Sequence, residues 1–180
     1  TNLGELEIDN TLTNQEVLEV IQRGELLTRL ANQVKTEALK LGEDAGLIMI
    51  QIDSLESGVM NTLNLVLKDH LPVRKFRTTT KAINEISILS YDELNAIDFL
   101  GSVLFKLPLD DISVSKGYRV LARLPGLPEN LHDQIIHKFK TLPKLLTASP
   151  EKLFEVEGIG RSRAQQLRDY FDTLLKNIGF

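Results

Sequence analysis

Apolar residues recur along most of this chain at steps of three and four, the spacing that places side chains on one face of an α-helix. The first such stretch predicts a long helix from residue 13 to about residue 41. Thr13 and Glu16 have the spacing of a capping box at its start, and Gly42 is suited to end it. The stripe, which is typical of a helical bundle, consists of Val17, Val20, Ile21, Leu27, Leu30, Ala31, Val34, Ala38 and Leu41.

A second stripe predicts another helix that continues to about His70, with apolar residues at positions 48, 52, 55, 59, 63 and 66. The run Ile48–Ile52 would also suit a strand, but no nearby segment offers a pairing partner. Two antiparallel helices joined by a short loop must bury their apolar stripes on something. A third helix or a partner chain would serve.

Shorter helices are predicted over Thr78–Ile88 and from a second capping box at Ser90 to about Phe105. Residues 106–116 contain Pro108 and two adjacent aspartates, and they predict a linker. A basic run precedes the first of these helices and fits either a solvated loop or a phosphate contact; it consists of Lys68, Arg74, Lys75, Arg77 and Lys81.

The most distinctive pattern runs from Leu153 to Leu167. An apolar face ends at Val156, Gly158-Ile159-Gly160 forms a tight turn, and Ala164 begins a new apolar face. Two short helices joined by a Gly-apolar-Gly turn are the helix-hairpin-helix element of many DNA-binding proteins that ignore base sequence. The turn could instead be only a connection between packed helices.

These residue types suit a bound phosphate. Glycine lets an anion approach the main chain, and the unpaired amides that open the second helix form an anion site with the positive end of the helix dipole. The apolar residue of the turn is expected to pin the two helices together. The candidate DNA contacts of this hairpin are Gly158, Ile159, Gly160, Arg161, Ser162, Arg163 and Arg168.

A degenerate copy of the pattern lies 32 residues upstream, with Leu121 in the place of Leu153 and Gly126 in the place of Gly158. Pro128 replaces Gly160, so this hairpin offers one amide fewer and we interpret it as partly structural. Its candidate contacts are Arg123, Gly126, Leu127 and Pro128. A pair of hairpins can grip phosphates on both strands, which suits recognition of DNA shape.

Charge divides the chain at about the predicted linker. Residues 116–180 contain 11 basic and 7 acidic residues, whereas residues 1–115 contain 10 basic and 18 acidic residues. We therefore predict an all-α chain with a helical linker or spine domain at residues 1–112 and a helix-hairpin-helix DNA-binding domain at residues 113–180. The small basic excess predicts weak, salt-sensitive DNA binding.

Other function classes find little support. The chain has no cysteine, no apolar run near ~18 residues and no signal-peptide pattern, so we expect a cytoplasmic protein without a membrane partner. Its three histidines lack metal-ligand spacing, and no nucleotide-binding loop or nucleophile motif occurs. We expect no catalytic residue, metal ligand or cofactor in this chain.

Residues 117–128 (GYRVLARLPGLP) and 156–164 (VEGIGRSRA) closely resemble the C-terminal part of the DisA family of bacterial DNA integrity scanning proteins, which are diadenylate cyclases. The resemblance extends upstream through residues 39–42, 47–48 and 68–69, and so covers most of the chain. It implies that Gly158, Ile159, Gly160 and Arg161 belong to a DNA-contacting hairpin, and that Gly126 and Pro128 form the corresponding turn.

The resemblance further implies an N-terminal cyclase domain, a helical spine and a helix-hairpin-helix domain similar to that of the Holliday-junction protein RuvA. In such proteins the cyclase joins two ATP into cyclic di-AMP with a divalent metal, assembles as an octamer and is suppressed by branched DNA. The cyclase motifs Asp-Gly-Ala and Arg-His-Arg do not occur in this chain. The chain thus resembles the linker and DNA-binding parts, with ATP and metal confined to the missing domain.

We therefore expect binding of branched or junction DNA through backbone phosphates, without enzymatic activity in this chain. One alternative is a protein-interaction or oligomerisation module, which the net acidity and Pro128 favour. Another is an accessory domain of a repair nuclease, which the helical N-terminal half makes less fitting.

Overall fold

The capping boxes expected from the sequence both form, and they fix where two of the helices begin. Thr13 accepts a hydrogen bond from the amide of Glu16, and Ser90 accepts one from the amide of Glu93. Each glutamate accepts in return from the amide of its capping residue, at 2.7 and 2.8 Å. These reciprocal bonds satisfy amides that a helix leaves unpaired at its first turn.

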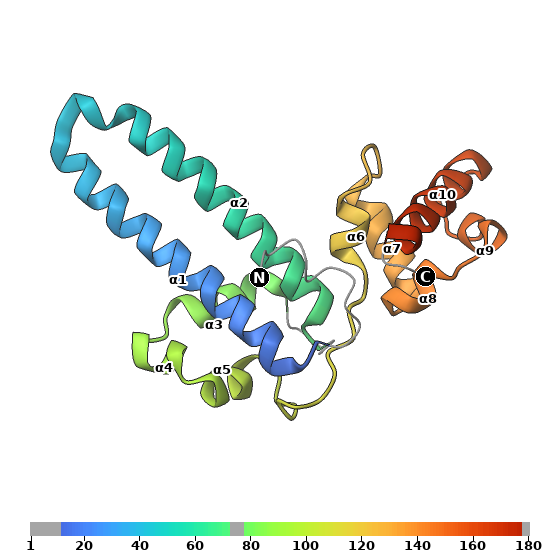
Figure 1. Cartoon of the computed structure of the whole chain (residues 1–180), viewed down its shortest axis with the longest axis horizontal. Coiled ribbons are helices and arrows are strands. Elements are labelled where there is room, and N and C mark those ends of the chain that lie inside the picture. The colour runs from blue at the N-terminus through green and yellow to red at the C-terminus, as the bar shows by residue number, and fades with distance from the viewer. Residues whose placement is uncertain (1–11, 73–77, 178–180) are drawn as a thin grey trace. The chain divides into compact units, whose positions relative to one another are not determined.

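The computed structural model describes residues 12–72 and 78–177 (Figure 1). Within these residues the regular elements are helices, apart from one antiparallel bridge between Thr13 and Ile112, which confirms the predicted all-α fold. The chain divides into two compact units, one of residues 12–113 and one that begins at residue 114. Three residues of the predicted basic run, Arg74, Lys75 and Arg77, lie outside the described residues.

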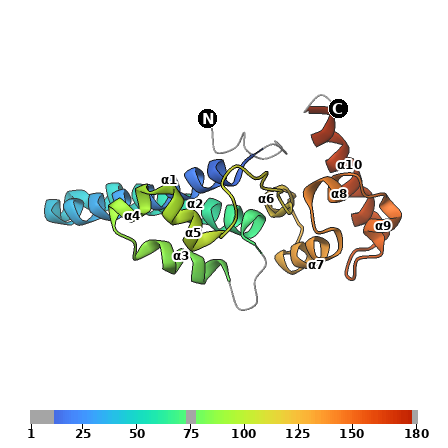
Figure 2. The same cartoon turned by 90° about the horizontal axis from the view of Figure 1, so that it is seen from below.

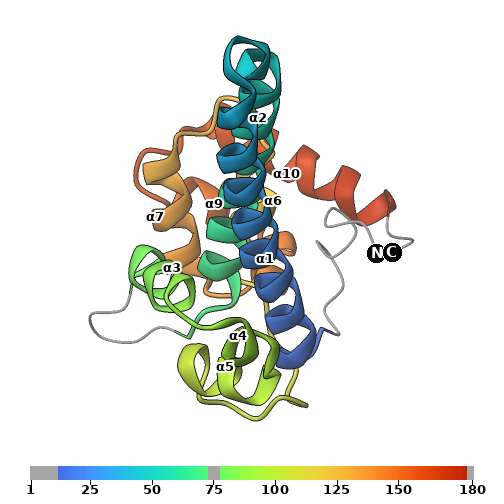
Figure 3. The ribbon, with the colours of Figure 1, turned by 90° about the vertical axis from the view of Figure 1, so that its left-hand side faces the viewer.

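The first unit is built on two long antiparallel helices, α1 (Asn14–Ala38) and α2 (Gly46–His70), joined by the 3-10 segment η2 (Leu39–Ala45). Figure 1 shows α1 and α2 running side by side over most of their length, and in Figure 3 α1 lies in front of α2. The segment Ile48–Ile52 is helical, so the strand alternative does not apply. Gly42 turns the chain between the helices with φ +68°, a conformation that favours glycine.

Three shorter helices, α3 (Thr79–Ser87), α4 (Tyr91–Asn95) and α5 (Ile97–Leu104), pack along one side of this pair (Figure 2). The core that they share with one end of the pair is fully buried and includes Leu18, Ile21, Leu67, Ile86, Leu94, Leu100, Leu104 and Phe105. The third helix that the apolar stripes required is therefore supplied by α3–α5, for that end of the pair only.

Two predicted boundaries were wrong. The single helix expected from Ser90 to about Phe105 is broken at Ala96, whose extended backbone (φ −82°, ψ 93°) separates α4 from α5. The linker expected at residues 106–116 was predicted to begin too early in the sequence, because the first part of this segment is bound to the start of α1. There the amide of Asn14 donates to the carbonyl of Asp111 at 2.9 Å, and the amide of Ser113 to that of Leu12 at 2.7 Å.

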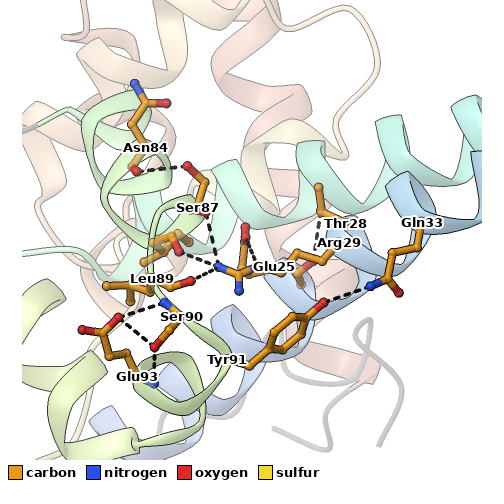
Figure 4. Close-up of polar contacts among 12 residues, drawn as sticks. Glu25, Thr28, Arg29, Gln33, Asn84, Ser87, Leu89, Ser90, Tyr91 and Glu93 are labelled. Carbon is orange, nitrogen blue, oxygen red and sulfur yellow. Dashed lines mark hydrogen bonds and ion pairs between the residues drawn. The ribbon is translucent and has the colours of Figure 1, made fainter. Parts of the chain in front are cut away.

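Arg29 of α1 ties the α3–α4 connection to the long helices (Figure 4). Its Nη2 donates to three backbone carbonyls, those of Ile86 at 3.1 Å, Ser87 at 3.3 Å and Leu89 at 2.7 Å. Its Nε donates to the buried carboxylate of Glu25 at 2.8 Å. One guanidinium group thus satisfies the carbonyls at the end of α3 and neutralises a buried charge.

The second unit contains α6 (Tyr118–Ala122), α7 (Glu129–Phe139), α8 (Leu142–Leu146), α9 (Pro150–Phe154) and α10 (Arg161–Asn177). Its core includes the apolar residues that the sequence pattern aligned, among them Leu121, Leu127, Ile135, Phe139, Leu153, Ile159, Leu167 and Phe171. We call residues 118–139 the first hairpin and residues 150–177 the second hairpin.

The two hairpins follow one plan with an offset of 32 residues. The helix of residues 118–122 corresponds to that of residues 150–154, and the next helices begin at residues 129 and 161. Gly126 and Gly158 have nearly the same φ, +79° and +82°. The internal repeat inferred from the sequence is therefore present in the backbone as well.

Candidate nucleic-acid interface

The second hairpin turns at Gly158, and this glycine is required by the fold. Its φ of +82° is one that other residues rarely adopt, and a Cβ placed on it would lie 2.8 Å from Cδ2 of Leu131. Leu131 belongs to α7, so the second turn rests directly on the first hairpin. Gly158 thus shapes the hairpin whether or not a ligand binds.

Gly160, two residues further on, is different. Its φ lies outside the left-handed region, and no described atom lies within 4 Å of a Cβ placed on it. Neither backbone conformation nor packing explains a glycine here. An open main chain at this position allows close approach of a ligand, which is one of the uses of glycine.

The helix α10 begins directly after Gly160, so its first amides follow this glycine in the chain. Ala164 donates its amide to the carbonyl of Gly160 at 2.9 Å, which is the first i to i−4 bond of the helix. The amides of Arg161, Ser162 and Arg163 precede that bond, at the positive end of the helix dipole. A helix end of this kind is suited to an anion.

The side chains at this helix end add two positive charges. Arg161 is exposed, and its guanidinium carbon lies 5.7 Å from the centroid of the Phe154 ring. Arg163 is half-buried and donates from Nη1 to the carbonyl of Gly158 at 3.2 Å, so it also braces the turn. Ser162 is exposed and offers a hydroxyl group.

Ile159 and Leu127, the apolar residues of the two turns, are 4% and 8% exposed, so their side chains do not reach the surface. Their amides are also occupied: that of Ile159 donates to Val156 at 3.0 Å and that of Leu127 to Leu124 at 3.4 Å. Both residues belong to the core of the unit, and for Ile159 this is the pinning role that the sequence predicted. We leave them out of the candidate contact surface.

Arg168 is also placed in the interior. Its side chain is only 13% exposed and donates from Nη1 to the carbonyls of Leu146 at 2.7 Å and Ala148 at 2.8 Å. Its Nη2 binds the carboxylate of Asp172 at 2.9 Å. The expectation that Arg168 faces a phosphate is revised: it fastens α10 to the end of α8. Sequence spacing could not reveal carbonyl partners about twenty residues away.

The first turn offers a weaker version of the same arrangement. No described atom lies within 4 Å of a Cβ placed on Gly126, so its main chain is open like that of Gly160. Pro128 caps α7 without an amide hydrogen, and Glu129 puts a negative charge on the first turn of that helix. Arg123 is exposed at the end of α6.

An ion pair that sequence analysis missed joins the two hairpins. Nζ of Lys138, in the last turn of α7, lies 2.6 Å from Oε2 of Glu155 in the second turn. The hydrogen bond from Lys138 and its charge lower the pKa of Glu155. The two residues line a groove of ≈ 470 Å³ together with Asp133, Gln134, His137, Val156 and Glu157.

A second groove, of ≈ 360 Å³, lies between α9 and the start of α10 and is lined by Pro150, Glu151, Phe154, Arg161, Ala164 and Gln165. Hydrogen bonds from its own backbone amide and from the Ser149 hydroxyl lower the pKa of Glu151. A carboxylate in this groove repels phosphate. For an anion that approaches this end of α10, the main chain at Gly160 is therefore a more favourable position than this groove.

The arrangement is suited to binding anions at two similar turns. Among the residues that the structure describes, no group of three or more His, Cys, Asp and Glu side chains could hold a metal ion. In the same part of the chain, no helix has the length and apolar character that crossing a membrane demands.

Comparison with known proteins adds the family. Residues 1–105 match the model of the DisA bacterial checkpoint controller linker region. The DNA integrity scanning protein DisA of Streptomyces griseus is 32% identical to this chain over 185 residues, and that of Streptomyces coelicolor is 33% identical. Each of these alignments covers 97% of this chain and 49% of the relative.

The DisA of Frankia casuarinae is 33% identical over 180 residues, which cover 97% of this chain and 50% of that protein. The chain therefore spans about half the length of the curated relatives it matches. The linker match covers more than half of the residues in the chain. On this evidence, the chain belongs to the DisA family.

Proposed function

We propose that the second unit binds DNA through the sugar–phosphate backbone and is the DNA-sensing part of a DisA-like protein. The observation that carries the proposal is Gly160, whose open main chain leads into the unpaired amides of α10. Arg161 adds an exposed positive charge at the same place. Contacts of this kind position a protein on DNA without reading bases.

The first hairpin also has an open turn, at Gly126. The φ of Gly126 is nearly the same as that of Gly158 in the second turn. Two phosphate sites on one unit favour nucleic acid whose strands pass at defined positions, and branched DNA offers such positions. The preference for junctions rests on this pairing and on the family.

In the proposed full-length protein, an N-terminal domain would join two ATP into cyclic di-AMP in the cytoplasm with a divalent metal. DNA on the C-terminal unit would suppress that reaction, and the helical unit of residues 12–113 would lie between the two in the sequence. This chain carries no catalytic step in the proposal. The octameric assembly and the cyclase partner likewise belong to the proposal.

The test is a salt titration of binding to a four-way DNA junction and to a linear duplex of equal length. We expect tighter binding to the junction, and a logarithm of affinity that falls with the logarithm of salt concentration by about 0.9 per phosphate neutralised. Gly160→Leu should weaken binding at least about tenfold, because its side chain would occupy the path of the phosphate. Arg161→Gln should lower the slope by about one.

The choice of Gly160 matters because replacing Gly158 would strain the fold as well. Gly46→Leu is the matched control: Gly46 opens α2 in the other unit, and no described atom lies within 4 Å of its Cβ position. Its DNA affinity should equal that of the unchanged chain. Absence of binding at low salt by a folded chain would refute the proposal, and full affinity in Gly160→Leu would exclude the second turn.

A further inference from the structure

The long helices α1 and α2 continue beyond the part covered by α3–α5 as a two-helix arm (Figures 1 and 3). Large aliphatic side chains are exposed on this arm and on the stretch of α1 that leads into it, because an antiparallel pair of helices has little interior in which to bury them. Five of them, each between 38 and 70% exposed, form what we call the arm face: Leu27, Leu30, Val34, Ile48 and Leu55.

Helical spacing places the five on one side of the arm. Leu27 and Val34 lie four residues before and three residues after Ala31, which is one heptad before the buried Ala38. On α2, Ile48 and Leu55 have the same spacing around the buried Ile52. In an antiparallel pair, the two helices touch along a line. Two stripes that are rotated from this line by the same angle and in the same direction face the same side of the pair.

That side is turned away from α3–α5. Arg29, which binds the carbonyls of the α3–α4 connection, lies two residues or about 200° around α1 from Leu27. Val34 is nine residues after Glu25, the buried partner of Arg29, and therefore half a turn away from it. Leu30 lies nearer to α4, three residues before Gln33, whose Nε2 donates to the Tyr91 hydroxyl at 3.5 Å, but it is still 54% exposed. The described residues of the unit therefore leave the arm face uncovered.

The arm face carries no charge. In residues 26–36 and 46–62 the charged residues are Arg29, Lys35, Asp53 and Glu56. Arg29 binds Glu25, and Lys35 binds both Asp53 and Glu56 across the helix pair. The residues that border the stripe on α2 are neutral, namely Gln51, Ser54, Gly58 and Thr62. On α1, exposed charged residues lie at the two ends of the stripe: Arg23, which pairs with Glu19, and Glu37, which pairs with Lys40. Between these ends the surface has little to attract DNA and little to desolvate against an apolar partner.

Its size fits a dimer interface. With ordinary accessible areas for these residues, the arm face leaves roughly 400 Å² of apolar surface exposed. A stable interface buries about 800 Å² on each partner, of which a little more than half is apolar. The apolar area of the arm face matches that share.

We propose that the arm face binds the arm face of a second copy of this chain. A second copy supplies an uncharged apolar stripe of equal length, and a two-fold axis would pair the two arms as a four-helix bundle. Each stripe would then meet its own equivalent, and the exposed leucines of α1 and α2 would become core residues. This interaction is separate from the proposed DNA contacts.

The experiment is sedimentation velocity on the full 180-residue chain, without DNA, over a range of about 1 to 200 µM. We expect a dimer that dissociates on dilution. Leu30→Gln combined with Leu55→Gln should raise the dissociation constant at least about tenfold. Circular dichroism should show unchanged helix content, because both side chains are already exposed in one chain.

Ile50→Gln is the matched control. Ile50 is 68% exposed against 70% for Leu55, on the same helix, but points about 140° away from it. Its dissociation constant should equal that of the unchanged chain. A chain that stays monomeric at the highest concentration would overturn the proposal, as would an Ile50→Gln effect equal to that of the arm-face variant.

Discussion

Single residues in this chain show how one turn can combine structural and functional demands. Gly158 is fixed by its backbone conformation and by Leu131, whereas Gly160, two positions along, is constrained by neither. A Gly-x-Gly pattern in a sequence cannot separate these cases, because each glycine alone satisfies the pattern. Only the surroundings of each Cβ position distinguish the residue that makes the turn from the residue that leaves it open.

The Lys138–Glu155 pair leads to a prediction about pH. Because Lys138 lowers the pKa of Glu155 in the folded chain, the pair stabilises the fold above the ordinary glutamate pKa of about 4.3. That contribution should disappear as pH falls through the lowered pKa. Glu155→Gln should therefore be less stable than the unchanged chain at pH 7, and the difference should shrink below about pH 4.

NMR titration of the Glu155 carboxyl would measure the shift directly, and chemical unfolding at several pH values would measure its effect. In Lys138→Met the Glu155 pKa should rise towards its ordinary value. A carboxyl that titrates equally in both chains would show that the pair does not form in solution.

Among the helices, the sequence predicted positions better than ends. The capping boxes at Thr13 and Ser90 located two helix starts because both partners lie within four residues. The break at Ala96 was missed because apolar spacing continues across it, from Leu94 to Leu100, and both of these residues are fully buried. Local signals are legible in a sequence, whereas breaks set by distant packing are not.

The same limit applies to the candidate interface. The repeat, the two turns and the start of α10 followed from the spacing of glycines and apolar residues. The roles of Arg168 and of the Lys138–Glu155 pair did not, since both depend on partners 17 to 22 residues away in the sequence. Arginines near a glycine turn look alike until their carbonyl partners are known.

Arg29 of α1 holds the connection between α3 and α4, so its removal should affect how these helices pack. Arg29→Met removes three hydrogen bonds to carbonyls and leaves the carboxylate of Glu25 buried without its partner. We expect a loss of about 3 kcal/mol in the free energy of unfolding, measured by urea denaturation.

Arg23 provides the comparison. It pairs with Glu19 at the same i, i+4 spacing, but its side chain is 60% exposed. Arg23→Met should cost less than about 0.5 kcal/mol. Equal losses in the two variants would mean that the carbonyl contacts of Arg29 contribute nothing to stability.

At the scale of the whole molecule, the chain consists of two units with opposite charge balance. The second unit has its own core, so a fragment of residues 114–180 should fold. Domains of about 60 residues are marginally stable. We therefore expect circular dichroism to show cooperative thermal unfolding of the fragment with a low midpoint. At protein concentrations too low for the whole chain to dimerise, the DNA affinity of the fragment at a given salt concentration should lie within about threefold of that of the whole chain.

If the fragment is unfolded, the second unit needs the first for stability, and the division into units would describe the contacts but not the folding. If the fragment folds and loses DNA binding, part of the interface lies in residues 12–113. Dimerisation through the arm face would add a further property, since two DNA-binding units on one particle raise the effective concentration of the second contact.

The contact between Gly158 and Leu131 limits how this DNA-binding surface can be transplanted. The second turn, although richer in amides and arginines, is supported by a helix of the first hairpin. A chimera carrying only residues 150–177 would lose that support, and the turn would be free to open. The smallest part that could be transferred to another protein therefore contains both hairpins, because the first hairpin supports the turn of the second.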